Sequence, residues 1–343
     1  MVGVSCVLNT GLTECFDCQG RKIDCAGSGQ DAEHANFTPC PEPRFKILDN
    51  NLVLDQLTQL VWPKDANIAD NILNWHEGLE WICELNGKEF FGRDDWRMPN
   101  RRELRSLIDH SCKNPALPKG HVFENVNLGW YWTSTTSTVN NRYAWYLHTE
   151  GGRMFYGNKS EFYWVWPVAG ENKTLPRTGT NVTYDDNGKV CTSVCNGQDG
   201  DLLSGIVWPT PRFEMTIYGV LDNLTGLVWC QETFINDNPV SWDKAIEMID
   251  CYCRDRGQQY RLPTINELES LVDASQHFPA LPANHPFSNP REAYWSSTTS
   301  GYETDWAYVL YLNKGAVGVG YKTNHDFHVW PVISHSQLNI DSS

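Results

Sequence analysis

The sequence has no long apolar run and comparatively little positive charge. No stretch approaches the ~18 consecutive apolar residues of a membrane helix, so we expect no membrane insertion. Lys and Arg together number 27 against 42 Asp and Glu, which gives a net charge of −15. Because an acidic chain repels phosphate backbones, we also expect no nucleic-acid partner.

The usual motifs of catalysis and cofactor binding are absent as well. The chain has no glycine loop of the P-loop or dinucleotide-binding type. Its hydroxyl-rich segments, "STTST" and "SSTTSG", have no His/Asp pair at recurring positions that would activate a serine. The ten His are scattered along the chain. We therefore predict no catalytic residue, no enzyme activity and no cofactor.

The first residues, "MVGVSC", lack the basic and apolar segments of a signal peptide, although Cys is abundant. Cys15-x-x-Cys18 with Cys25 nearby could hold zinc, but no second CxxC or His pair follows at zinc-finger spacing. Disulfides, with a pairing that one sequence does not determine, explain the twelve Cys better. We expect an extracellular, cell-surface or periplasmic protein whose signal peptide has been removed; a reduced cytosolic protein is the alternative.

The chain does contain a tandem duplication along nearly its whole length. "DQLTQLVW" (55–62) matches "DNLTGLVW" (222–229), "YWTSTTS" (131–137) matches "YWSSTTS" (294–300), and "GQD", "PRF" and "VWPV" each occur twice in the same order. The offset drifts only between 161 and 168 residues. We therefore predict two domains of one type, residues 1–170 and 171–343, joined near the Pro- and Gly-bearing segment 169–180.

Each copy follows one pattern of elements. After a Cys-bearing leading segment and a short strand comes a helix, capped by Asn74 with Glu77 in the first copy and by Ser241 in the second. A second helix is predicted from Asn100 and Thr264 onward, and several aromatic strands with glycine turns complete the copy. This pattern predicts an α+β fold with two helices and an aromatic-rich antiparallel β region in each domain.

The second helix starts at a motif that could be read as an active site, "WRMPNRREL" in one copy and "YRLPTINEL" in the other. Arg97 with Glu103, and Arg261 with Glu267, could form a catalytic acid and its partner. The spacing has a simpler explanation, since a Glu three residues after the N-cap forms a capping box and the Arg can bind a carboxylate. We interpret this motif as structural.

Three other residue sets have competing interpretations. Asp55 and Asp222 could bind calcium, but the second copy offers almost no further oxygen ligands, so we favour a turn-forming role. Calcium is an alternative that the sequence does not support, and we predict no metal. The matched Trp residues are interpreted as mostly core: Trp62/Trp229, Trp75/Trp242, Trp132/Trp295, Trp145/Trp306 and Trp166/Trp330. Polar and aromatic residues of the late loops are the ligand-binding candidates: Arg142, Tyr143, Tyr156, Asn158 and Lys159, with Tyr302, Asp305, Tyr321, Asn324 and His325.

The order of motifs resembles the Lcl C-terminal domain family, named after a domain of a bacterial collagen-like adhesin. The motifs that carry the resemblance are "GQD", "PRF", "DxLTxLVW", "WR(M/L)PxxxEL", "YW(T/S)STT" and "VWPV". It covers each copy almost from end to end. The family's usual "GDGTV" turn is "DNNLVL" in one copy and "TIYGVL" in the other, which puts a cation bound at that turn in doubt.

A more distant resemblance concerns residues 240–269, "VSWDKAIEMIDCYC…YRLPTINELE", which are similar to a segment of formylglycine-generating-enzyme-like domains. That resemblance implies a C-type-lectin-like fold for both copies. It does not imply the oxidase activity, because no Cys follows Cys253 to supply the late Cys pair. Domains of this fold present loops on a β scaffold and bind sugars, proteins or surfaces.

From these observations we expect a secreted or surface-exposed bacterial binding or adhesion module, which recognises a glycan or a cell-surface protein through its late loops. Two alternatives are kept. The chain could be a structural subunit that assembles with other surface proteins into a filament or similar assembly. It could also be an enzyme of unknown type that uses the repeated Arg/Glu motif.

Overall fold

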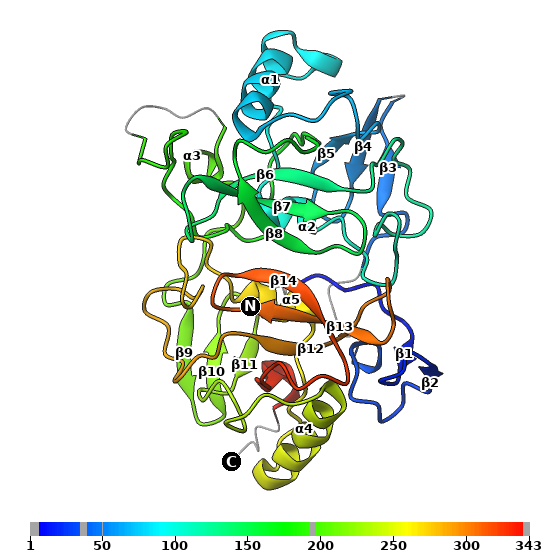
Figure 1. The fold of residues 1–343 in the computed structure, drawn as a ribbon, viewed down its shortest axis with the longest axis vertical. Coiled ribbons are helices and arrows are strands. Elements are labelled where there is room, and N and C mark those ends of the chain that lie inside the picture. The colour runs from blue at the N-terminus through cyan, green and yellow to red at the C-terminus, as the bar shows by residue number, and fades with distance from the viewer. Residues whose placement is uncertain (1–6, 35–39, 50, 192–196, 339–343) are drawn as a thin grey trace. The chain divides into compact units, whose positions relative to one another are not determined.

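The computed structural model describes residues 7–34, 40–49, 51–191 and 197–338, and the chain forms two compact units (Figure 1). The first-repeat unit comprises Pro39–Val207 and Asp273–Ser275. The second-repeat unit comprises Met1–Thr38, Trp208–Val272 and Gln276–Ser343.

The first-repeat unit contains two antiparallel sheets and three α-helices in its described part. One sheet is formed by β3 (Phe45–Ile47), β4 (Leu52–Asp55) and β5 (Val61–Pro63). The other strands are β6 (Trp130–Thr136), β7 (Tyr143–His148) and β8 (Met154–Asn158). The helices are α1 (Trp75–Gly87), α2 (Arg101–Arg105) and α3 (Asp199–Leu202), with a 3₁₀ turn η2 at Phe90–Gly92.

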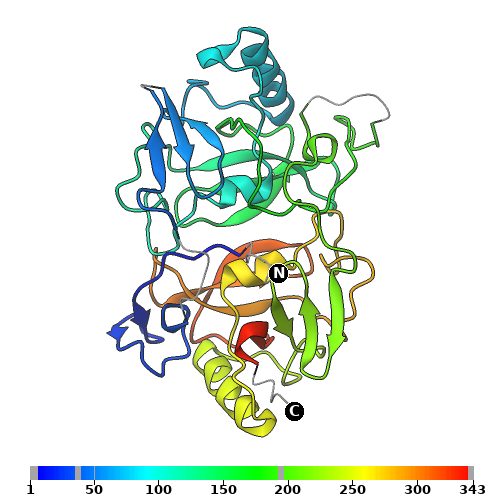
Figure 2. The ribbon, with the colours of Figure 1, turned by 180° about the vertical axis from the view of Figure 1, so that it is seen from behind.

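The second-repeat unit repeats this plan (Figure 2). Its first sheet has β9 (Phe213–Thr216), β10 (Gly219–Asp222), β11 (Leu227–Trp229) and β15 (Val332–Ser334). Strands β12 (Tyr294–Thr299), β13 (Trp306–Tyr311) and β14 (Ala316–Tyr321) run antiparallel. Helices α4 (Trp242–Arg256) and α5 (Ile265–Ser270) match α1 and α2; a hairpin of β1 (Cys15–Phe16) and β2 (Lys22–Ile23) and the 3₁₀ turns η1 (Asp31–Glu33) and η3 (His335–Gln337) complete it. The predicted α+β class is confirmed.

Buried tryptophans form the centre of each unit, as predicted. Trp75 and Trp132 lie in one apolar cluster, and Trp242 and Trp295 occupy the same places in the other. Each ring satisfies its N–H inside the core: Trp75 Nε1 donates to the carbonyl of Thr133 (2.7 Å), and Trp242 Nε1 to that of Ser296 (2.7 Å). A buried indole needs such a partner, so each ring both fills the core and fixes the helix against its strand.

One predicted match between the copies was wrong. Trp145 and Trp306 are not structural counterparts, because the strand register pairs Thr136 with Ala144 in one unit and Thr299 with Ala307 in the other. Trp145 therefore corresponds to Tyr308. The error came from matching two identical letters, because equivalent positions in these strands, such as Tyr131 and Tyr294 or Ala144 and Ala307, share one constant offset that Trp145 and Trp306 do not have.

The "WR-P" motif begins α2 and α5, as predicted. Asn100 and Thr264 are the N-caps, and both helices have complete capping boxes with Glu103 and Glu267. Asn74 and Glu77 form the predicted capping box of α1, whereas Ser241 stands at the N-cap of α4 without a side-chain hydrogen bond. Helix α2 ends at Arg105, earlier than its apolar spacing indicates.

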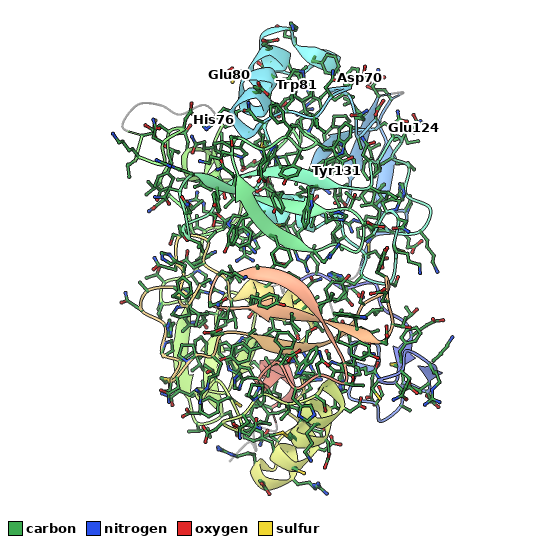
Figure 3. All side chains as sticks on the ribbon, in the orientation of Figure 1. Asp70, His76, Glu80, Trp81, Glu124 and Tyr131 are labelled. Carbon is green, nitrogen blue, oxygen red and sulfur yellow. A yellow bond between two sulfur atoms is a disulfide. The ribbon has the colours of Figure 1, made fainter. Side chains whose placement is uncertain are left out.

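Each unit contains the leading segment of the other sequence repeat. Residues 1–38 precede the first repeat but belong to the second-repeat unit, and residues through 207, which precede the second repeat, belong to the first-repeat unit. In Figure 1, and with the side chains added in Figure 3, the β1–β2 hairpin lies in the same body as α4, and α3 in the same body as β6–β8. The sequence repeats and the compact units are therefore not the same stretches of chain.

A buried aspartate holds each leading segment in place. Thr298 Oγ1 donates to Asp31 Oδ2 (2.6 Å), and Thr135 Oγ1 donates to Asp199 Oδ2 (2.7 Å). The same hydroxyls accept the first backbone N–H of the helices, from Ile265 (2.9 Å) and Arg101 (3.0 Å). The recurring "GQD" thus joins a leading segment to the start of α5 or α2.

The hairpin of the first leading segment is closed by a disulfide between Cys15 and Cys25. Cys191, in the second leading segment, is also disulfide-bonded. Seven other cysteines in the described part of the chain are free: Cys18, Cys40, Cys83, Cys112, Cys230, Cys251 and Cys253. The predicted disulfides are therefore present in the leading segments, and the pairing Cys15–Cys25 excludes a zinc site built from Cys15, Cys18 and Cys25.

Burial raises the pKa of Asp31 to about 6, despite the hydrogen bond from Thr298 and the charge of Arg261 nearby. The folded-state pKa lies above the unfolded value of ~4. The stabilising contribution of this carboxyl to the folded state is therefore complete below pH ~4 and is lost as the pH rises through about 6. We expect the free energy of unfolding of Asp31→Asn, relative to that of wild type, to rise by on the order of 2 kcal/mol between pH 4 and pH 7. Urea unfolding across this pH range measures the difference.

Asp199 offers a second, independent case, because burial also raises its pKa to about 6. Asp199→Asn should therefore show the same change, and Asp255→Asn, at an exposed position of α4, should show none. Parallel pH profiles for wild type and both buried-site variants would contradict this expectation.

Candidate functional site

The repeated Arg/Glu pairs are buried, fully bonded ion pairs. Arg97 donates twice to Glu103, at 2.5 and 2.9 Å, and Arg261 twice to Glu267, at 2.6 and 2.5 Å. Neither glutamate is exposed: Glu103 is 0% and Glu267 2% accessible. Because an acid–base catalyst must reach its substrate, these positions indicate a structural role.

The oxygens of Glu103 also hold the neighbouring chain segments. Oε2 accepts from the Asn100 N–H (2.9 Å), and Oε1 accepts from Ser204 Oγ (2.7 Å) and Asn172 Nδ2 (3.2 Å). Arg97 itself is paired through its backbone with Val168, in "VWPV". One carboxylate thus connects the helix start, the end of the repeat and the second leading segment.

Asp55 and Asp222 form turns, as predicted, and each also binds an arginine that the sequence interpretation missed. Arg44 donates to both oxygens of Asp55 (3.0 and 2.8 Å), and Arg212 to both oxygens of Asp222 (3.2 and 3.1 Å). Asp55 Oδ1 also accepts from the Leu57 N–H (3.0 Å). The joint recurrence of "PRF" and "DxLT" was the signal that could have revealed this pairing.

The late-loop candidates of the first copy do not form one exposed cluster. Arg142 is exposed, and its Nε donates to the carbonyl of Asn187 in the second leading segment (3.2 Å). Tyr143 and Tyr156 are half-buried cross-strand neighbours with ring centroids 6.1 Å apart. Asn158 closes a turn by accepting from the Ser160 N–H (3.0 Å).

The candidates of the second copy divide in the same way. Tyr302, Asn324 and His325 are exposed. Tyr321 packs beside Trp306 with centroids 5.5 Å apart, and the carbonyl of Asp305 accepts from the Lys322 N–H (3.0 Å). Next to Asp305, Thr304 Oγ1 donates to the carbonyl of Gly20 (2.8 Å), so a leading segment contacts the late loops in this unit as well.

Lys159, the fifth candidate of the first copy, is buried rather than exposed. Its Nζ lies 4.0 Å from the centroid of the Trp75 ring, and Lys322 lies over Trp242 in the same way at 4.1 Å. Burial lowers the pKa of Lys159 to about 7 and that of Lys322 to about 8. These lysines are core components that stack on the central tryptophans.

A different set of residues forms an aromatic surface in the first-repeat unit. This aromatic face consists of Trp130 on β6, Tyr146 and His148 on β7, and Phe155 on β8. Trp130 lies 4.4 Å from both Tyr146 and His148 and 6.4 Å from Phe155, measured between ring centroids. All four side chains are partly exposed. The sequence interpretation did not single out these residues.

The aromatic face extends the apolar side of the sheet beyond the end of the core. Tyr146 packs against the buried Trp132 (5.7 Å), which belongs to the core cluster, whereas Trp130 and His148 lie one pair further along the strands. Leu128 and Phe162, on the adjoining loops, are 53% and 52% exposed. A cluster of partly exposed rings of this kind is typical of interaction sites in soluble proteins.

Polar groups border this surface. The carboxylate of the exposed Glu161 accepts from the Tyr163 hydroxyl (2.8 Å), and Tyr163 packs on Tyr146 (5.0 Å). His148 Nδ1 lies 3.0 Å from the Glu150 carbonyl, and burial lowers the pKa of this histidine. The site therefore combines ring faces with an anionic oxygen and an imidazole that is neutral at pH 7.

The second-repeat unit has the same strands without this face. Register places Ala293, Val309, Tyr311 and Gly318 at the positions of Trp130, Tyr146, His148 and Phe155. The fold is thus built equally well with small and aliphatic residues at three of the four positions. An ungapped comparison of the two copies, extended from the matching "YWTSTTS" and "YWSSTTS", could have revealed these differences.

Both copies match one protein family. The description of that family is Lcl C-terminal domain, and the matches cover residues 51–169 and 218–333, more than half of the chain. The chain belongs to the Lcl C-terminal domain family, which confirms the predicted resemblance. A comparison with curated proteins gave no match. Among the described residues, no helix has both the length and the apolar character that crossing a membrane requires.

We expect Glu103→Gln and Glu267→Gln to destabilise their units by about 3 kcal/mol, because each leaves a buried arginine without its counter-charge. Thermal unfolding should show a lower Tm for both variants. Glu214→Gln, at an exposed position of β9, is the matched control and should leave Tm unchanged. An unchanged Tm in either buried-site variant would contradict the structural role.

Proposed function

We propose that this chain is a surface-exposed bacterial binding module that recognises glycans through the aromatic face of its first-repeat unit. Its family suggests a bacterial surface-type domain. The single observation that carries the proposal is the aromatic face itself, which one unit has and the other lacks although both share the same strands. We further propose that both units have a C-type-lectin-like fold, the fold implied by residues 240–269.

A sugar ring has an apolar face of C–H groups and a rim of hydroxyls, and the aromatic face offers a complement to both. The rings of Trp130 and Tyr146 supply broad apolar area at little cost in side-chain entropy. The carboxylate of Glu161 and the imidazole of His148 supply hydrogen-bonding groups beside them. A site with ring faces and few polar groups suits a neutral glycan better than a charged polymer.

The predicted late-loop site remains a second candidate for the same function. Its best exposed members are Tyr302, Asn324 and His325, which lie away from the core of the second-repeat unit. The enzyme alternative is not favoured, because Glu103 and Glu267 are enclosed and fully bonded. An extracellular location fits the disulfide Cys15–Cys25, since such bonds persist in oxidising compartments.

We expect Trp130→Ala to weaken glycan binding at least ~10-fold, a loss of about 1.4 kcal/mol, because the mutation removes the largest ring of the face. Tm should change little, since the side chain is partly exposed and its counterpart in the other unit is Ala293. Binding is measured first on a glycan array and then by titration with the best ligand.

Two controls locate the site. Ile217→Ala removes a 91% exposed apolar side chain from the second-repeat unit and should leave binding unchanged. The double variant Asn324→Ala/His325→Ala tests the late loops. Binding that survives Trp130→Ala but is lost in the double variant would move the site to the late loops; no binding across broad glycan panels would reject glycan recognition.

A further inference from the structure

The two leading segments share the same internal hydrogen bonds and the same aspartate contact with their units. In one, the side-chain amide of Gln30 accepts a hydrogen bond from the N–H of Phe16 and donates one to its carbonyl, both at 3.0 Å. In the other, Gln198 brackets Tyr184 in the same way at 3.0 and 2.9 Å. The buried Asp31 and Asp199 then accept from the matched threonines described above. Each unit therefore has an acceptor site for one type of segment.

The covalent connection of the segment to its acceptor differs between the units. The segment around Asp199 follows β8 in sequence, so it docks on the domain that it leaves. The segment around Asp31 precedes β3 of the first-repeat unit, yet it docks on the unit whose main part begins only at Trp208. Docking thus depends on recognition by the acceptor site and not on the order in which the chain delivers the segment.

The acceptor site of the second-repeat unit binds its segment mainly through backbone groups. Lys322 Nζ donates to the carbonyls of Phe16 (3.1 Å) and Asp17 (3.3 Å), and Thr304 Oγ1 donates to that of Gly20 (2.8 Å). Asn266 Nδ2 donates to the carbonyl of Leu8 (3.0 Å). These bonds span the length of residues 7–34, so the segment is held at several points.

The hairpin fits its acceptor closely at the turn. Gly20 has φ +75°, and a Cβ added there would lie 2.7 Å from Thr304 Oγ1. The disulfide Cys15–Cys25 constrains the hairpin before it docks, which reduces the ordering cost of binding. The acceptor domain matches the family over residues 218–333, whereas residues 7–34 lie outside both matched ranges. The segment thus resembles a ligand that this chain carries for a family domain.

From these observations we propose that residues 7–34 also dock in trans, on the second-repeat unit of a second copy of this chain, and so join copies head to tail. The contacts are those already made within one chain, so exchange requires no new interface. Because the segment and the acceptor site are unlike surfaces, an open dimer keeps one undocked segment at one end and one empty acceptor site at the other. Further copies can then add at both ends.

Docking within one chain competes with docking between chains. A tethered segment has an effective concentration in the millimolar range, so dilute chains remain closed. When copies are crowded on a surface or concentrated in solution, the concentration of segments from other chains rises relative to the effective concentration of the tethered segment. We therefore expect exchange to depend steeply on protein concentration.

The direct test uses the intact chain. Equal amounts of unlabelled and ¹⁵N-labelled protein are concentrated together to millimolar levels, diluted, and examined by native mass spectrometry. We expect dimers of mixed mass whose share grows with the concentration reached during mixing. The variant Thr304→Trp places a large side chain where Gly20 packs and should abolish these dimers. Glu303→Gln, at an exposed neighbouring position, should still form them.

A second measurement removes the competition within the chain. A variant lacking residues 1–34 should bind an oxidised synthetic peptide of residues 7–34. Asp31→Ala in the peptide should weaken binding at least ~10-fold, and Glu14→Gln, in an exposed ion pair with Lys22, should leave it unchanged. If the shortened chain is unfolded alone, the peptide should restore its cooperative unfolding transition.

Three results would overturn the proposal. One is the absence of mixed dimers at every concentration. Another is dimers that persist in Thr304→Trp, because they would use some other surface. The third is a shortened chain that neither binds the peptide nor regains its fold in its presence.

Discussion

The rest of the structure depends on one buried ion pair in each unit, between the arginine and the glutamate of the "WR-P" motif. In the first-repeat unit, Glu103 caps its helix, neutralises Arg97 and holds Ser204 and Asn172, while the backbone of Arg97 pairs with Val168. A buried charge is costly unless it is paired and fully bonded. This ion pair therefore brings together three stretches of chain that are distant in sequence: residues 97–103, residues 168–172 and Ser204.

Sequence reasoning worked best where the determinants of structure are local. Proline, N-cap and N3 glutamate fix the start of a helix within seven residues, so α2 and α5 were predicted with their capping boxes. The duplication was equally visible, because whole motifs recur in order. The tryptophan core followed from repeated rings among apolar neighbours. Only the match of Trp145 with Trp306 was wrong, because two identical letters were paired although the strands place Tyr308 opposite Trp145 in the alignment of the copies.

The aromatic face and the docking of residues 7–34 on the second-repeat unit could not be predicted, since both depend on contacts between residues distant in sequence. Asp31 meets Thr298 across 267 positions, and nothing near "GQD" indicates which copy of "STT" it binds. The aromatic face assembles from three strands, and its members are ordinary strand residues when read singly. Lys159 was chosen as an exposed loop residue, yet it follows the last residue of β8 and turns inward over Trp75.

The unequal strands β6–β8 and β12–β14 have a consequence for how a duplicated protein acquires new properties. Two copies of one scaffold lie in the same chain, and the positions that carry partly exposed rings in one copy are the buried Ala293, Val309 and Gly318 in the other. A substitution that costs stability in one unit leaves the other unit intact to hold its half of the chain. Duplication therefore lets one copy carry large rings at positions that the other fills with small or aliphatic residues, while both copies keep the same strands.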